Sequence, residues 1–278
     1  KGVTRRVVVV RAPDQKYFEQ AIFLLREEAE SPDPPEEQVL KQAQAVADAD
    51  FIFVMVGYPK DVEEVFCAPG GILESAKPGA IAVDMTTSSP TLAQRLYALG
   101  AEKGIAVLDA PVSGGDKGAR EATLSIMAGG DGPAFQKALP LLEQMGKSIL
   151  LMGPAGCGQH TKMANQIAIS GCVAAVCEAI AYAKRCGLDP QDMFDAISTG
   201  AAGSWQLTNN GQKIINGDYA PGFYVKHFIK DMNIALDEAQ ARDLDLTVLH
   251  MVRDKYDELA AQGGADEGTQ ALIKVIDK

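Results

Sequence analysis

The sequence predicts an α/β domain built on a doubly wound parallel sheet, followed by an all-helical domain that begins with a long helix. Two observations lead to this prediction. Up to residue 152, short β-rich runs alternate with helical patterns of about 10–15 residues, which is typical of βαβ units. From residue 153 onward, every periodic segment is helical. We therefore expect one domain over residues 1–152 and a second over residues 153–278.

The strands expected in the first half are short apolar runs, several of them rich in β-branched residues, which suit strands buried on both faces of a sheet. They cover Val7–Val10, Phe51–Val56, Ala80–Met85, Ala106–Ala110, Leu124–Ala128 and Ile149–Leu151. Helices are indicated between them by apolar residues three and four positions apart and by Pro or Asp at the start. They cover Asp14–Glu30, Gln38–Ala49, Lys60–Phe66, Pro90–Lys103 and Pro133–Met145.

The second half opens with a long helical pattern over Thr161–Cys186, rich in Ala, Gly, Ser and Cys. Small side chains of this kind permit the close approach of neighbouring helices. The helical patterns that follow cover Asp189–Ser198, Ser204–Ile215, Phe228–Arg242, Leu246–Gln262 and Gly268–Lys278. A second domain made only of helices is the expected result.

Composition excludes several classes of protein. The chain has 26 Lys and Arg against 37 Asp and Glu, a net charge of −11, which argues against binding to nucleic acids or anionic membranes. No apolar run reaches the ~18 residues of a transmembrane helix, and the start lacks the apolar core of a secretory signal. The 5 cysteines form no CxxC pair and the 3 histidines are scattered, so we expect reduced thiols and no metal site. These features predict a cytoplasmic protein.

A glycine-rich segment, Asp109–Asp116 (DAPVSGGD), follows an expected strand. Ligands of open α/β sheets bind beyond the carboxyl ends of the strands. Ser113, Gly114 and Gly115 offer a hydroxyl group and approachable backbone N–H groups, which suit a carboxylate. The alternative interpretation is a turn whose glycines serve geometry alone. Gly57, Tyr58 and Pro59 also follow a strand, and we expect them near a bound cofactor.

A second motif, Gly156–Gln166 (GCGQHTKMANQ), begins the long helix. Asn165 and Gln166 come three and four residues after Lys162, so the three side chains share one helix face. In a helix of mostly small and apolar residues, this face suits an ammonium group that contacts a substrate oxygen and relays a proton. An exposed lysine in the first turn explains the pattern about equally well.

These two motifs, in this order, resemble those of the β-hydroxyacid dehydrogenase family, which includes 3-hydroxyisobutyrate dehydrogenases and semialdehyde reductases. Asp84–Pro90 (DMTTSSP) is similar to the family's D-x-S-[ST]-x-x-P turn, and the segment Lys230-Asp-Met is similar to its K-D-[LM] motif. The resemblance extends from about residue 48 to the end of the chain. Four motifs in register make a chance match unexpected.

The resemblance implies an NAD(P)-dependent enzyme that interconverts a short hydroxy acid and its aldehyde acid, with a Rossmann-type domain followed by a helical domain. Position by position, it implies Lys162 as the catalytic proton relay. It implies substrate contacts for four further residues: Ser113, Gly114, Asn165 and Gln166. It implies cofactor contacts for Thr87 and Lys230. It also implies a small carboxylate substrate and a homodimer or homotetramer.

One departure from the family concerns the glycine fingerprint G-x-G-x-x-G, which is missing before Phe51, where Gly2 is the only glycine. Either Val7–Val10 is the family's second strand and a β–α unit is missing upstream, or it is the first strand and the following RAPDQ replaces the loop. The former favours Arg11 near the ribose 2′ position, and so NADP over NAD. A non-catalytic or truncated member with a defective dinucleotide site is the alternative function.

Overall fold

The computed structural model describes residues 6–10, 21–25 and 46–278. The chain forms two compact units, residues 1–162 and 163–278. The boundary expected at residue 152 falls just before helix α7 (Cys157–Arg185), whereas the two units divide inside this helix. Helix α7 therefore contributes its first turns to unit 1 and the rest of its length to unit 2.

Unit 1 contains a six-stranded sheet in the order β3-β4-β5-β7-β6, with β8 paired to β7. Its strands are β3 (Phe51–Val54), β4 (Ile81–Asp84), β5 (Ala106–Asp109), β6 (Val112–Ser113), β7 (Leu124–Gly129) and β8 (Gly146–Gly153). Strands β3, β4 and β5 are parallel, as the alternation of strands and helices predicts. The sheet is mixed beyond them, because β7 runs antiparallel to β5 and parallel to β8.

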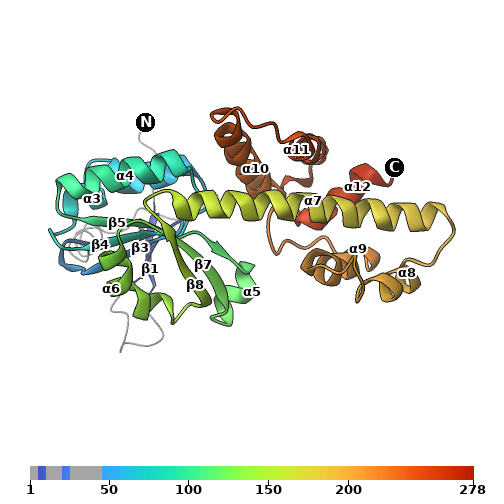
Figure 1. Cartoon of the computed structure of the whole chain (residues 1–278), viewed down its shortest axis with the longest axis horizontal. Helices are drawn as coiled ribbons and strands as arrows, with labels where there is room; N and C mark the ends of the chain where they lie inside the picture. Colours follow the sequence, from blue (N-terminus) through green and yellow to red (C-terminus); the bar gives the residue numbers. More distant parts are fainter. Residues whose placement is uncertain (1–5, 11–20, 26–45) are drawn as a thin grey trace. The chain divides into compact units, whose positions relative to one another are not determined.

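Helices cover both faces of this sheet, so the doubly wound arrangement is confirmed. Alternate residues of the central strands belong to two cores: Ala82 and Val107 pack on one face, Val83 and Leu108 on the other. The first core includes side chains of α2 (Pro59–Cys67), α3 (Ile72–Ser75) and α4 (Pro90–Glu102), and the second those of α6 (Gly132–Leu142). Figure 1 shows α4 and α6 on opposite sides of the strands. A short helix, α5 (Gly115–Arg120), follows β6.

Two strands near the start of the chain, β1 (Arg6–Val10) and β2 (Ala21–Leu25), form a separate antiparallel pair. The expected strand at Val7–Val10 is confirmed. The helix expected over Asp14–Glu30 is wrong at residues 21–25, because the run AIFLL pairs with the valines of β1 and five consecutive apolar residues fit a strand as well as a helix. Residues 46–48 are helical, and the remaining expectations for this region, Arg11 included, lie outside the described residues.

Unit 2 is helical, as predicted. After α7 come α8 (Pro190–Ile197), a π-helix η1 (Gln206–Gly211), α9 (Gln212–Ile215), α10 (Val225–Gln240), α11 (Thr247–Ala261), the 3₁₀ turns η2 (Gly264–Asp266) and η3 (Thr269–Leu272), and α12 (Ile273–Ile276). The core of the unit joins α7, α10 and α11 through side chains such as Val173, Phe228 and Tyr256. Two of the expected helices are not single α-helices. The segment Ser204–Ile215 contains the π-helix η1 followed by α9, and the segment Gly268–Lys278 contains the 3₁₀ turn η3 followed by α12.

Helix α7 corrects the expectation that no segment is apolar enough to span a membrane. By length and composition alone it meets that criterion. In its most apolar stretch 44% of the residues are buried inside the structure, and core helices meet the same criterion. The helix therefore carries no conclusion about a membrane.

Candidate active site

The turns after β3 and β4 meet at one edge of the sheet, because parallel strands place their carboxyl ends together. Thr86 ties the two turns to each other: its Oγ1 accepts a hydrogen bond from Val56 N at 2.9 Å, and its own N–H donates to Asp84 Oδ1 at 2.9 Å. The structure thus brings Thr87, on the second turn, to the same edge as the segment Gly57-Tyr58-Pro59, which leads into α2.

Asp109 ends β5 at this edge and anchors the start of α7. Its side chain is 3% exposed, and its two oxygens accept hydrogen bonds from Gly156 N (2.8 Å) and Gln159 N (2.9 Å). Burial raises the pKa of Asp109, while the backbone donors of Gly156, Gln159 and Gly158 act in the opposite direction. A carboxylate at a helix N-terminus satisfies backbone N–H groups that would otherwise have no partner inside the helix.

Lys162 lies in the second turn of α7 and is 7% exposed, so the interpretation as a solvated surface lysine is wrong. Its Nζ donates a hydrogen bond to Val112 O at 2.7 Å. Val112 directly precedes Ser113, with which it forms β6, and Gly114 and Gly115 follow with φ values of 131° and 61°. The structure therefore places the Lys162 ammonium group at the residue that directly precedes the segment Ser113–Gly115. Glycine suits this turn because positive φ angles strain other residues.

In unit 2, three of the expected residues belong to one polar chain centred on Asp231. Asn165 Nδ2 donates to Gln166 Oε1 at 2.8 Å, and Gln166 Nε2 donates to Asp231 Oδ2 at 2.7 Å. Lys230 Nζ forms an ion pair with Asp231 Oδ1 at 3.1 Å. Asp231 is fully buried, so the Lys230 ammonium group offsets the cost of placing a charge there. Because α7 is continuous, Asn165 and Gln166 follow Lys162 by one helical turn.

Sequence reasoning missed three buried polar residues of these networks: Asp109, Gln159 and Asp231. Two of them stand inside the quoted motifs DAPVSGGD and KDM, yet nothing local showed that their carboxylates are buried. Gln159 stands in the motif GCGQHTK and makes three hydrogen bonds with residues far away in the sequence. The signal available for it was an amide placed three residues before the lysine, on the same helix face.

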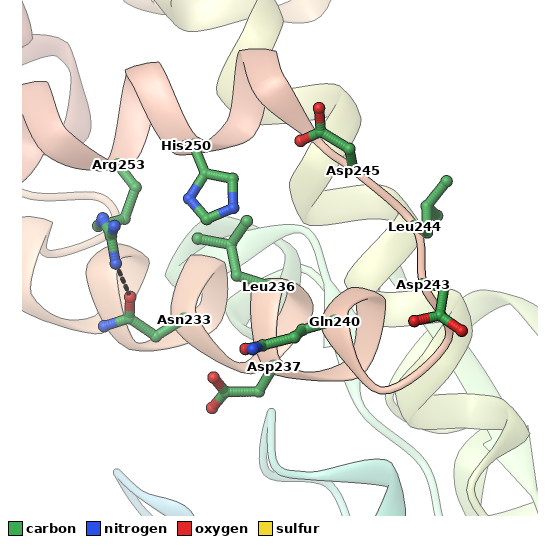
Figure 2. Close-up of a pocket in the computed structure, with 9 residues that line it drawn as sticks. All are labelled: Asn233, Leu236, Asp237, Gln240, Asp243, Leu244, Asp245, His250 and Arg253. Carbon is green, nitrogen blue, oxygen red and sulfur yellow. Dashed lines mark hydrogen bonds between the residues drawn. The ribbon is translucent and has the colours of Figure 1, made fainter.

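A separate pocket of about 840 Å³ opens between α10 and α11 (Figure 2). Its lining is largely polar and acidic: Asn233, Leu236, Asp237, Gln240, Asp243, Leu244, Asp245, His250 and Arg253. Arg253 Nη1 donates to Asn233 Oδ1 at 2.8 Å across one end of it, as the dashed line in Figure 2 marks. None of the residues expected in the site lines this pocket.

Among the residues that the structure describes, no group of His, Cys, Asp and Glu side chains is arranged to hold a metal ion. The edge formed by β3 and β4 does suit a polar organic ligand. Ser88 Oγ is buried there and has no hydrogen-bond partner among the described residues. An unsatisfied buried hydroxyl group is costly, and a ligand that bonds to it removes the cost. The residues present thus fit one end of a dinucleotide, with Thr87 and Ser88 as the polar groups that would hold it.

Comparison with known families and proteins agrees with this fold. Residues 26–153 match the NAD-binding domain of 6-phosphogluconate dehydrogenase, and residues 156–276 match a family described as NAD-binding of NADP-dependent 3-hydroxyisobutyrate dehydrogenase. The oxidoreductase YkwC of Bacillus subtilis is 51% identical over 228 residues, which are 82% of this chain and 79% of that one. The chain belongs to the β-hydroxyacid dehydrogenase family.

Other members of the β-hydroxyacid dehydrogenase family are similar to this chain over a comparable share of its length. The 2-hydroxy-3-oxopropionate reductase of Escherichia coli is 38% identical over 239 residues, 86% of this chain and 82% of that one. A structure of 3-hydroxyisobutyrate dehydrogenase from Mycobacterium tuberculosis, determined with L-serine, is 32% identical with a TM-score of 0.78, covering 85% of this chain and 82% of that one. The chain is thus an NAD(P)-dependent oxidoreductase with a Rossmann-like domain followed by a helical one.

Proposed function

We propose that this protein interconverts a short β-hydroxy acid and the corresponding aldehyde acid, with Lys162 as the residue that delivers or removes the proton. One observation carries the proposal. The buried Lys162 ammonium group lies 2.7 Å from Val112 O, at the residue that directly precedes the segment Ser113–Gly115, and its helix is anchored at the sheet edge by Asp109. A positioned ammonium group next to a turn suited to a carboxylate provides for both ends of such a substrate.

The chemistry that these residues would perform follows from charge. A dinucleotide bound at this edge would supply the hydride for reduction of the aldehyde carbon, or would accept it from the alcohol carbon. During reduction, negative charge develops on the carbonyl oxygen. The Lys162 ammonium group would stabilise that charge and transfer its proton to the oxygen, leaving an alcohol and a neutral amine that regains a proton from water. Ser113, Gly114 and Gly115 would bind the carboxylate, and Asn165 and Gln166 would orient the substrate.

The substrate class is supported by the names of the relatives. One acts on 2-hydroxy-3-oxopropionate, and a relative from Eubacterium barkeri, 35% identical over 240 residues, acts on 2-(hydroxymethyl)glutarate. Both compounds carry the reacting carbon next to the carbon that bears a carboxylate. We therefore propose a 3-hydroxy or 3-oxo carboxylic acid as the substrate of this protein.

A binding titration is the first test. We expect the intrinsic or nucleotide fluorescence to saturate with NADPH at micromolar concentrations, and more weakly with NADH if Arg11 contacts the ribose 2′-phosphate. Turnover would then be measured with 2-hydroxy-3-oxopropionate, succinic semialdehyde, glyoxylate and 3-hydroxyisobutyrate. If neither nucleotide binds at millimolar concentration, the proposal fails. The alternative, a non-catalytic or truncated family member with a defective dinucleotide site, then replaces it.

Replacing Lys162 by Met tests its role as proton relay. We expect kcat to fall by about 10²–10⁴ because the alkoxide loses its proton donor and its stabilising charge. The Kd for NADPH should change little, since Lys162 is assigned to the substrate oxygen. Lys137→Met, on the exposed face of α6, is the matched control and should leave kcat unchanged. A Lys162→Met enzyme within threefold of wild type would refute the assignment.

Two expectations remain predictions beside this function: assembly as a homodimer or homotetramer, and a cytoplasmic location. Light scattering of the purified chain at several concentrations tests the first, and fractionation of cells that produce the protein tests the second.

A further inference from the structure

We propose that Gln159 is a positioning residue of the active site: its side-chain amide clamps the backbone on both sides of Thr87 and couples this turn to the helix that carries Lys162. The inference rests on the proposed function, in which Lys162 contacts the substrate oxygen, and on the cofactor contact that the family resemblance implies for Thr87. It assigns to one buried amide the task of keeping these two groups in register.

Two side-chain hydrogen bonds define the clamp. Gln159 Oε1 accepts from Ser88 N at 2.9 Å, and Gln159 Nε2 donates to Thr86 O at 2.7 Å. The carbonyl of Thr86 and the N–H of Ser88 belong to the two peptide groups that flank Thr87. Fixing both peptide groups restricts the φ and ψ angles of Thr87. The amide therefore sets the direction in which the Thr87 side chain leaves the turn.

The chemistry of the clamp requires an uncharged side chain that both donates and accepts. An amide offers an NH₂ group and a carbonyl oxygen in one plane, which match the C=O and N–H of the backbone. An ionised glutamate only accepts, so one of its oxygens would face Thr86 O without a proton between them. Gln159 is fully buried and Thr86 is 1% exposed, so water cannot replace a missing partner.

The same residue is tied to the lysine through the helix. Gln159 N donates to Asp109 Oδ2 at 2.9 Å, and Lys162 follows three residues later on α7. The helix start also lies close to the turn: a Cβ on Gly156 would come within 3.0 Å of Pro90 O. A displacement of the turn at Thr87 relative to Lys162 would thus have to break the amide clamp. Misplacement of about 1 Å between reacting groups costs up to about 10² in rate.

The test is the pH dependence of Gln159→Glu. When the glutamate is ionised, near pH 8, we expect kcat to fall about tenfold or more, with KM for the acid substrate within about twofold of wild type. Below its pKa, which burial raises, the carboxyl group donates to Thr86 O and accepts from Ser88 N as the amide does. The ratio of variant to wild-type kcat should therefore rise as the pH is lowered toward about 5. The ratio of variant to wild-type Kd for NADPH should fall over the same pH range, because the restored clamp also restores the cofactor contact of Thr87.

Gln270→Glu is the matched control. Gln270 is 2% exposed in unit 2, and its Nε2 donates to Asp218 O (3.1 Å) and Ala220 O (3.0 Å), so a glutamate there also faces backbone carbonyls. We expect this variant to lose thermal stability while keeping its wild-type kcat below the melting temperature. If Gln159→Glu also loses only stability, or its kcat ratio is independent of pH, the inference is overturned while the proposed function stands. If wild type neither binds NADPH nor turns over the acids, the proposed function fails and takes the inference with it.

Discussion

Asp109 is a carboxyl group on which burial and hydrogen bonding act in opposite directions. Burial disfavours its ionised form and raises its pKa, whereas the N–H groups of Gly156, Gln159 and Gly158 favour the ionised form. Burial is the larger of these effects. The residue that anchors the start of α7 is therefore one whose ionisation costs the folded state free energy.

We expect this cost to be visible in the pH dependence of stability. Between the ordinary pKa of an aspartate and the raised pKa, the folded state binds more protons than the unfolded state, so this residue makes the free energy of unfolding fall as pH rises and has no further effect above that interval. Asp109→Asn removes this dependence, but its NH₂ group faces a backbone donor, which costs about 1–3 kcal/mol. Urea unfolding of both proteins at several pH values gives the difference. A difference that does not change with pH would contradict the assignment.

At the scale of residues, sequence reasoning selects groups whose chemistry is conspicuous locally. Lys162 was predicted as a site residue because an ammonium group is unusual in a helix of small apolar residues. Asp109 and Gln159 did not, because their partners are distant in the chain: 50 residues separate Gln159 from Asp109, and 73 and 71 separate it from Thr86 and Ser88. No local pattern reports such a contact, since it exists only once the sheet and α7 are assembled.

At the scale of elements, the first turn of α7 depends on the absence of a side chain at one position. A Cβ on Gly158 would overlap Met127 O and would lie 2.7 Å from Asp109 O. We expect Gly158→Ala to lower the free energy of unfolding by about 1–3 kcal/mol or more, because rigid backbone atoms of β5 and β7 must move. Gly171→Ala, farther along the same helix with nothing within 4 Å of its Cβ, should stabilise the protein by up to about 1 kcal/mol.

Chemical denaturation of the two alanine variants measures both effects. The pair separates close packing of the helix start from general helix propensity, because both substitutions add one methyl group to α7. Equal changes in stability would mean that the helix start does not pack against β5 and β7 as closely as the structure shows. A loss of kcat in Gly158→Ala alone would be the further sign that this turn positions Lys162.

Prediction of helices and strands from the sequence succeeded where the burial of one or both faces of a segment determines its pattern of apolar residues. The runs at β4 and β5 are strands because they lie inside a sheet covered by helices on both sides. It failed at β2, where the run AIFLL has no periodicity that distinguishes a strand from a buried helix, and pairing with β1 decides. The π-helix at Gln206–Gly211 also has no signal in hydrophobic spacing, because six residues are too few to distinguish its wider i→i+5 turns from those of an α-helix.

At the scale of the whole molecule, the division into an α/β half and a helical half follows from a change of hydrophobic period along the chain. Each half has its own core: strands with flanking helices in unit 1, helices alone in unit 2. The hydrophobic pattern does not indicate the exact residue at which the two units divide, because α7 is one uninterrupted helix and the division falls within it. Net charge and cysteine count restrict the class of protein but say nothing about where such a helix changes its partners.

The core of unit 2 contains a thiol that can report on its unfolding. Cys177 is fully buried on α7, and burial raises its pKa to about 12, so almost no reactive thiolate exists near neutral pH. Cys172, on the same helix, is exposed. In a variant that keeps Cys177 but replaces the other cysteines with Ser or Ala, we expect a thiol reagent to label it only as denaturant unfolds unit 2, with the same midpoint as circular dichroism.

A variant that keeps only Cys172 is the matched control, and its labelling should be fast in native buffer because an exposed thiol needs no opening of the structure. Both thiols lie on the same helix, so the difference in rate reports the free energy of opening the core around Cys177. If Cys177 reacts in native buffer as fast as Cys172, the packing of α7 against α10 and α11 must open without global unfolding. Labelling at the unfolding midpoint instead requires that this interface be lost together with the helical content.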